Sequence, residues 1–176
     1  MEMMIKELKN PITEKYLAFK NLVFDNNFSW YTNTSTLKEY GTIFYGHSLL
    51  ERPCMDGFSV SRIRSDYFDD VLEILVEIAK YNNLHIHYFL RMHVNATHNY
   101  GGGFACDPHY DHIFPHKNLL IYLNQASGPT VVIDSENRTE EYFHPKEDAI
   151  ITFEGKHYQY QPNVGERRIV LVATYV

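Results

Sequence analysis

Two histidines and one aspartate have the spacing in this sequence that points most directly to chemistry. His109 and Asp111 lie two residues apart, with Tyr110 between them. In an extended chain, residues two apart project to the same side, so both side chains can reach one ion while Tyr110 points away. A third ligand has to come from elsewhere in the fold, and His157 follows a strand-like segment near the C-terminus. These residues predict a metal site.

A set of two imidazoles and one carboxylate favours a particular kind of metal site. It occupies one face of the ion and leaves three neighbouring positions open, which suits Fe(II) when a two-pronged cosubstrate and O₂ must bind together. A structural zinc site would instead be closed by four protein ligands. The spacing alone is weak evidence, because the chain has 10 histidines and His157 could simply bond a neighbouring strand. The other histidines near these segments are interpreted as turn or strand-face residues: His85, His87, His93, His112 and His116.

Further motifs follow the HxD triplet in a fixed order. They are LIYLN at 120–124, GPT at 128–130, HPKED at 144–148 with AIITF after it, the distal His157, and RRIVL at 167–171. In this order the chain resembles the 2-oxoglutarate/Fe(II)-dependent oxygenase superfamily, in particular its prolyl-4-hydroxylase-like branch and the small oxygenases of bacteria and phages. The resemblance spans about residues 91–176. It departs from the family pattern at Pro129, where a glycine is usual, and at Asp148.

The resemblance implies an enzyme that hydroxylates a C–H bond of a peptidyl residue or a small molecule. It would consume 2-oxoglutarate and O₂ at Fe(II) and release succinate and CO₂, with ascorbate as a supporting reductant. The implied iron ligands are His109, Asp111 and His157. Related halogenases lack the carboxylate ligand, so the presence of Asp111 favours hydroxylation or oxidative demethylation.

The far carboxylate of 2-oxoglutarate would need a charged partner inside the barrel. Arginine offers a planar fork that matches a carboxylate with two hydrogen bonds. Arg167 and Arg168 are neighbours on a predicted strand, so only one can face inward; the family pattern favours Arg168, although the reverse assignment stays open. Tyr122 matches a tyrosine that donates a hydrogen bond to the same carboxylate in prolyl hydroxylases. Simple packing in the core is an equally good interpretation of Tyr122.

Two other classes of protein fit part of the pattern. A cupin-like metal protein that is not an oxygenase would need the metal ligands but not Arg168. A non-catalytic β-sandwich that mediates protein contacts would need neither, and its histidines would be incidental.

Composition narrows the remaining classes. The 176 residues suit one domain, 1–176, and a net charge of −6 without a basic cluster makes nucleic-acid binding unlikely. Two cysteines, Cys54 and Cys106, are too few for a disulfide scaffold and predict reduced thiols. With no apolar run of membrane-spanning length, the expectation is a cytoplasmic protein without a membrane partner.

The pattern of expected strands and helices that must position these residues predicts a mainly β (α+β) fold. We expect a double-stranded β-helix, that is a cupin-like jelly roll, with flanking N-terminal helices. A helical and loop cap is expected over 1–84 and the jelly-roll core over 85–176. The expected helices are 12–25 and 66–81, the second capped by Asp66. The expected strands are 85–95, 119–123, 130–134, 140–144, 149–153 and 168–176. The expected rim loops, 26–36, 50–65 and 97–108, carry Trp30, Tyr31, Phe58 and Tyr100.

Overall fold

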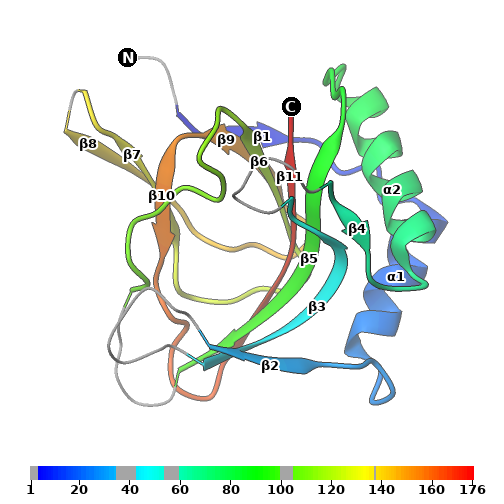
Figure 1. The fold of residues 1–176 in the computed structure, drawn as a ribbon. Coiled ribbons are helices and arrows are strands. Elements are labelled where there is room, and N and C mark those ends of the chain that lie inside the picture. The colour runs from blue at the N-terminus through cyan, green and yellow to red at the C-terminus, as the bar shows by residue number, and fades with distance from the viewer. Residues whose placement is uncertain (1–3, 35–42, 54–59, 100–104, 137) are drawn as a thin grey trace.

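The computed structural model describes residues 4–34, 43–53, 60–99, 105–136 and 138–176. Within these ranges the chain forms eleven strands and two helices arranged in three layers (Figure 1). A small sheet faces a large sheet, and the helices cover the opposite side of the large sheet. This is the mainly β jelly roll with flanking N-terminal helices that the sequence predicts.

The large sheet has eight antiparallel strands. Their order is β1-β9-β6-β11-β5-β3-β2, and β4 pairs with the end of β3 on the edge that faces away from β5. The strands are β1 (Lys6–Leu8), β2 (Tyr31–Thr34), β3 (Ile43–Glu51), β4 (Arg62–Ile63), β5 (Phe89–His98), β6 (Lys117–Tyr122), β9 (Ile150–Glu154) and β11 (Arg167–Tyr175). The C-terminal strand β11 lies in the middle, between β6 and β5, and so connects the two halves of the sheet.

The small sheet has three antiparallel strands in the order β10-β7-β8. They are β7 (Thr130–Asp134), β8 (Thr139–Phe143) and β10 (Lys156–Gln159). Because this sheet faces β1, β9, β6 and β11 (Figure 1), it encloses the interior of the roll with them.

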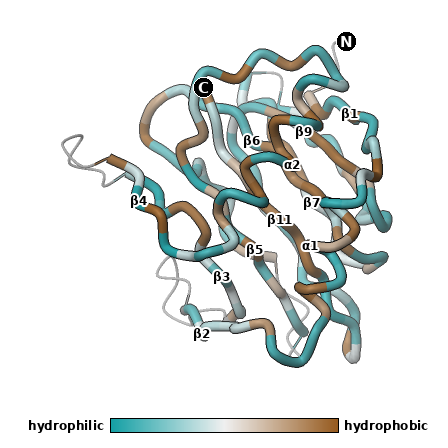
Figure 2. The backbone as a smooth tube through the Cα atoms, turned by 90° about the vertical axis from the view of Figure 1, so that its right-hand side faces the viewer, coloured by the Kyte–Doolittle hydropathy of each residue, from teal (hydrophilic) through white to brown (hydrophobic). Residues whose placement is uncertain are grey.

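Strand β11 separates two hydrophobic cores because its side chains alternate between faces. Val170 and Val172 point into the roll, where they pack with residues of β6, β7 and β9. Ile169 and Leu171 point the other way, into the larger core under the helices. Figure 2 views the molecule from the helix side, where hydrophobic and hydrophilic stretches alternate along the chain.

The two helices lie where the apolar periodicity predicts them. Helix α1 (Glu14–Phe24) begins after Thr13, whose side chain accepts a hydrogen bond from the Tyr16 amide. Helix α2 (Phe68–Tyr81) buries an apolar stripe against the sheet. The predicted cap Asp66 is wrong, because α2 begins after Tyr67 and its first turn has no side-chain cap.

The expectation that residues 1–84 form only helices and loops is also wrong. Strands β1 to β4 all come from this part of the chain, and β3 pairs with β5 next to the centre of the large sheet. The segment 26–36 contains β2, and 50–65 contains the end of β3 and all of β4. Strand β2 has the polar sequence YTNT because an edge strand needs backbone pairing with one neighbour but little burial.

Some predicted features lie outside the described residues, namely Cys54, Phe58, Tyr100 and the glycines at 101–103. Cys106 is a free thiol. Of the two described helices, neither is long and apolar enough to cross a membrane.

Candidate metal centre and cosubstrate pocket

The backbone holds His109 and His157 opposite each other. The amide of His109 donates to the carbonyl of His157 at 2.9 Å, and the amide of His157 donates back at 3.0 Å. His157 lies within β10, whereas the sequence placed it only after a strand. This antiparallel bridge brings the two imidazoles to a centroid separation of 4.6 Å.

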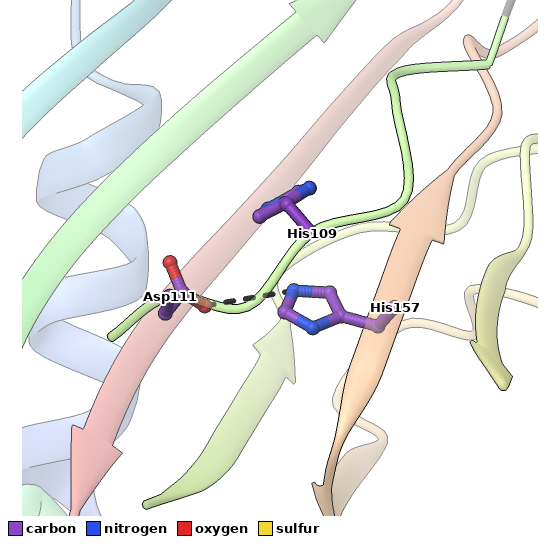
Figure 3. A group of neighbouring side chains, drawn as sticks. All are labelled: His109, Asp111 and His157. Atoms are coloured by element: carbon purple, nitrogen blue, oxygen red, sulfur yellow. Dashed lines mark ion pairs between the residues drawn. The ribbon is translucent and has the colours of Figure 1, made fainter. Parts of the chain in front are cut away.

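Asp111 completes the cluster. Nitrogen and oxygen atoms of His109, Asp111 and His157 that could bind a metal all lie within 4.8 Å of one another. Nε2 of His157 is 3.5 Å from Oδ2 of Asp111, as the dashed line in Figure 3 marks. Tyr110 is 55% exposed and points away. The alternation expected from the spacing is therefore present, and among the described residues this is the one group of three such side chains.

Hydrogen bonds from the protein orient both imidazoles. Nδ1 of His109 lies 2.7 Å from the carbonyl oxygen of Asp107, and Nδ1 of His157 lies 3.4 Å from that of Gly155. A ring that donates from Nδ1 keeps its Nε2 lone pair for a metal. The donor set therefore fits an ion bound by two Nε2 atoms and one carboxylate oxygen.

The surroundings favour the protonation states that a metal needs in two of the three residues. Burial lowers the pKa of His157 to about 4, and the nearby Asp111 charge only partly opposes this. For Asp111, burial alone would raise the pKa, but the charges of Arg91, His157 and Arg52 hold it well below its usual range. A neutral imidazole and an ionised carboxylate are thus the resting forms of these ligands.

His109 behaves differently from His157. Burial lowers its pKa, but hydrogen bonds to Cys106 and to the Asp107 carbonyl, with the charge of Asp111, outweigh burial and raise the pKa overall. His109 is therefore the member of the cluster that takes up a proton first as the pH falls.

Two arginines that the sequence did not single out contact Asp111. Nη1 of Arg91 donates to Oδ1 of Asp111 at 2.9 Å, and Nη2 of Arg52 lies 3.4 Å from the same oxygen. Side chains alternate along β5, so Arg91 lies on the other face of the strand from Met92 and Val94. This alternation could have indicated that Arg91 points inward. No sequence signal could have indicated Arg52.

A second polar group lies inside the roll around Arg168. This side chain is only 2% exposed. Its Nη2 donates to Oγ1 of Thr130 at 2.7 Å, its Nη1 lies 3.4 Å from Oε1 of Gln159, and its Cζ lies 5.3 Å from the ring centre of Tyr122. Thr130 and Gln159 were not predicted, although Gln159 is two residues from His157 on the same strand.

The Arg168 guanidinium lacks a negatively charged partner among the described side chains. It has no ion pair with any of them, and its Nε has no hydrogen-bond partner. A buried charge without a counter-ion is costly, so a carboxylate ligand fits this position. Arg167 is exposed, with its guanidinium over the Phe24 ring, so Arg168 is the one of the two arginines that is buried inside the roll.

Tyr122 is fully buried beside this arginine. Its hydroxyl donates to Oγ1 of Thr130 at 2.9 Å, and its ring stacks on Phe143. Burial raises the pKa of the phenol, so it remains a hydrogen-bond donor. Tyr122 therefore packs in the core and also offers a hydroxyl at the pocket.

The interpretation of His112 and His116 as solvated turn residues is wrong. Both are buried, each 6% exposed, with ring centroids 4.7 Å apart. Nε2 of His112 lies 2.7 Å from Oγ1 of Thr174 on β11. This contact anchors the turn after Asp111 to the sheet. The local sequence gives no sign of it, because the partner strand β11 lies far along the chain.

No protein-family model and no curated protein matches this sequence. Solved structures do share its fold. An oxidoreductase of the 2OG-Fe(II) oxygenase family from Burkholderia pseudomallei has a TM-score of 0.76 at 14% identity, covering 99% of this chain and 85% of that one. A prolyl hydroxylase from Trichoplax adhaerens, in complex with a hypoxia inducible factor oxygen degradation domain peptide fragment, has a TM-score of 0.61 at 11% identity, with 98% and 83% covered. The epimerase SnoN, in complex with Fe3+, alpha ketoglutarate and nogalamycin RO, has a TM-score of 0.63 at 12% identity, with 98% and 78% covered.

The chain thus has the fold of the 2-oxoglutarate/Fe(II) oxygenases, prolyl hydroxylases included. At these identities the likeness establishes the architecture. The predicted resemblance is confirmed at that level, and the chemistry has to be argued from the side chains.

Proposed function

We propose that this protein is an Fe(II)- and 2-oxoglutarate-dependent dioxygenase that hydroxylates a C–H bond. The observation that carries the proposal is a pair of features on one roll. His109, Asp111 and His157 converge with no fourth protein ligand among the described residues, and Arg168 lies buried without a counter-ion. Neither feature suits a structural zinc site or a plain β-sandwich.

In this proposal each residue has a defined task. His109, Asp111 and His157 bind Fe(II) and leave three positions of the ion open. Arg168 binds the far carboxylate of 2-oxoglutarate, and Tyr122 supports it through its hydroxyl and through Thr130. Bound iron with 2-oxoglutarate and O₂ would supply the oxidising chemistry, and succinate and CO₂ would be released.

The protein's own contribution is position and shielding. Apolar side chains of the small sheet, β6, β9 and β11 form one core inside the roll. In this proposal they keep water away from the cosubstrate at Arg168. The contacts at Nδ1 of His109 and His157 hold the two rings in place beside Asp111.

The substrate belongs to one of two classes in this proposal, a peptidyl residue or a small molecule. Structures with this fold hold a peptide fragment in one case and nogalamycin RO in another. We further propose that residues 1–176 act as one domain and that the protein works in the cytoplasm, as the sequence predicts.

A succinate-release assay tests the proposal. Wild-type protein should convert 2-oxoglutarate to succinate in the presence of Fe(II), O₂ and ascorbate, and His109→Ala should not. A mass gain of about 16 Da in a pool of candidate peptides and metabolites would then identify the substrate. Metal binding without any 2-oxoglutarate turnover, and with Arg168→Ala indistinguishable from wild type, would favour the cupin-like metal protein. A lack of stoichiometric metal binding would favour the non-catalytic β-sandwich.

A further inference from the structure

The two carboxylate oxygens of Asp111 have different surroundings. Oδ2 faces Nε2 of His157 across 3.5 Å, on the side of the metal cluster. Oδ1 accepts a hydrogen bond from Nη1 of Arg91 at 2.9 Å and has Nη2 of Arg52 at 3.4 Å. One oxygen is therefore directed at the cluster, and the other is occupied by the protein.

Arg91 is rigidly placed for this contact. It lies on β5, opposite Thr174 of the central strand β11, and its side chain is 14% exposed. Among the described residues, Asp111 is the one carboxylate within ion-pair distance of Arg91. The sheet thus presents the guanidinium to a single oxygen.

Arg52 contacts the same residue from a different direction. It follows β3, its side chain is 41% exposed, and its Nη1 donates to the main-chain oxygen of Asp111 at 2.9 Å. Its bond to the backbone is shorter than its contact with the carboxylate. Arg52 therefore secures the chain at Asp111, whereas Arg91 secures the side chain.

The number of carboxylate oxygens that bind decides how many metal positions remain open. A carboxylate can bind a metal through one oxygen or through both. If Asp111 bound through both, it would take a fourth position, and a two-pronged cosubstrate together with O₂ would no longer fit. The charge-assisted bond from Arg91 to Oδ1 opposes that second mode.

We propose that Arg91 is a positioning residue that holds Asp111 as a one-oxygen metal ligand. Arg52 assists by fixing the backbone at the same residue. This inference rests on the proposed iron site, but it concerns the geometry of the site and not the identity of the substrate.

Co(II) binding to the whole chain tests the proposal without turnover. Dissociation constants and visible absorption spectra would be measured anaerobically for wild type, Arg91→Met, Arg91→Lys and Arg52→Met. Arg64→Met is the matched control, because Arg64 pairs with Glu51 away from the cluster. The affinity of Arg91→Met for Co(II) should fall by about 10–100-fold, with a changed visible spectrum, because the second oxygen of Asp111 can then replace a water on the ion.

The other variants separate positioning from mere fold stability. Arg91→Lys retains a donor for Oδ1, so it should keep the wild-type spectrum. Arg52→Met should lose less affinity than Arg91→Met, and Arg64→Met should bind as wild type does. If Arg91→Met does not fold, Arg91→Leu, which also lacks a donor, is measured in its place with the same two readings expected.

The outcomes distinguish this inference from the proposed function. An unchanged affinity and spectrum in Arg91→Met or Arg91→Leu would overturn the positioning role while leaving the iron site intact. Wild-type protein that binds no Co(II), or binds it equally well after His109→Ala, would overturn the metal site itself.

Discussion

Replacing Arg168 by methionine should stabilise the ligand-free protein but weaken its binding of 2-oxoglutarate. The guanidinium is 2% exposed, has neutral hydrogen-bond partners in Thr130 and Gln159, and leaves Nε without a partner. Burying a charge without an opposite charge is unfavourable, and apolar replacements of buried ionic groups often stabilise proteins by about 1–4 kcal/mol. The contact with the Tyr122 ring offsets about 1–2 kcal/mol of that cost. We expect the free energy of unfolding of the ligand-free Arg168→Met protein to rise by up to about 3 kcal/mol.

The same substitution should weaken the binding of 2-oxoglutarate. A charge-assisted carboxylate pair in a buried pocket contributes about 2–4 kcal/mol, which corresponds to a dissociation constant about 30–1,000-fold higher. Urea unfolding in the presence of Mn(II), with and without 2-oxoglutarate, measures both effects in one experiment. Wild type should gain stability from the ligand, and the variant should gain little at the same concentration.

Arg167→Met is the matched control for this prediction. Arg167 is the next residue on the same strand, but it is exposed and lies over Phe24. The substitution Arg167→Met should leave 2-oxoglutarate binding unchanged. If Arg168→Met bound 2-oxoglutarate as wild type does, or if Arg167→Met lost the ligand instead, the assignment of the pocket would be refuted.

Three further predictions concern the metal-free protein, each measured by urea unfolding. The pKa of His157 is about 4 when folded but about 6.5 when unfolded. The unfolded chain therefore binds more protons between these values, so stability should fall by about 2–3 kcal/mol as the pH drops from 6.5 to 4; His157→Gln should flatten part of this slope, and an unchanged slope would contradict the cause. In Gly46→Ala the new Cβ would lie 2.2 Å from Nε2 of His93, which should cost about 1–3 kcal/mol. The added variant His93→Ala should recover part of the loss, because the new Cβ would still lie 2.9 Å from Nδ2 of Asn33; no recovery would refute the His93 contact. Asp111→Ala leaves the Arg91 charge buried and unpaired, so it should destabilise by about 3–5 kcal/mol as well as abolish turnover; adding Arg91→Met should restore most of that stability, and a neutral single variant would count against the ion pair.

The sequence predicts best where the geometry is local. His109 and Asp111 share a side because they are two residues apart, and Arg168 faces inward because the alternation of β11 is set by its apolar neighbours. The same rule applied to β5 places Arg91 on the inner face. It does not say which carboxylate lies there, because Asp111 reaches that point through the fold.

The sequence predicts least well where burial comes from distant segments. His112 and His116 look like polar turn residues, yet both are buried. His112 bonds Thr174 at the end of β11, and the His116 ring lies against the His112 ring. Strand β3 was not predicted, because polar residues interrupt its apolar pattern. Its His47 is nevertheless only 6% exposed, with Nδ1 2.8 Å from the Ser29 carbonyl oxygen.

Crystals grown anaerobically with Fe(II) and 2-oxoglutarate, with diffraction data recorded on both sides of the iron absorption edge, would test the central claim most directly. We expect a single anomalous peak about 2 Å from Nε2 of His109, Nε2 of His157 and one oxygen of Asp111. We also expect density for 2-oxoglutarate reaching Arg168. An iron peak elsewhere, or one bound by a fourth protein ligand with Arg168 empty of carboxylate, would contradict the claim.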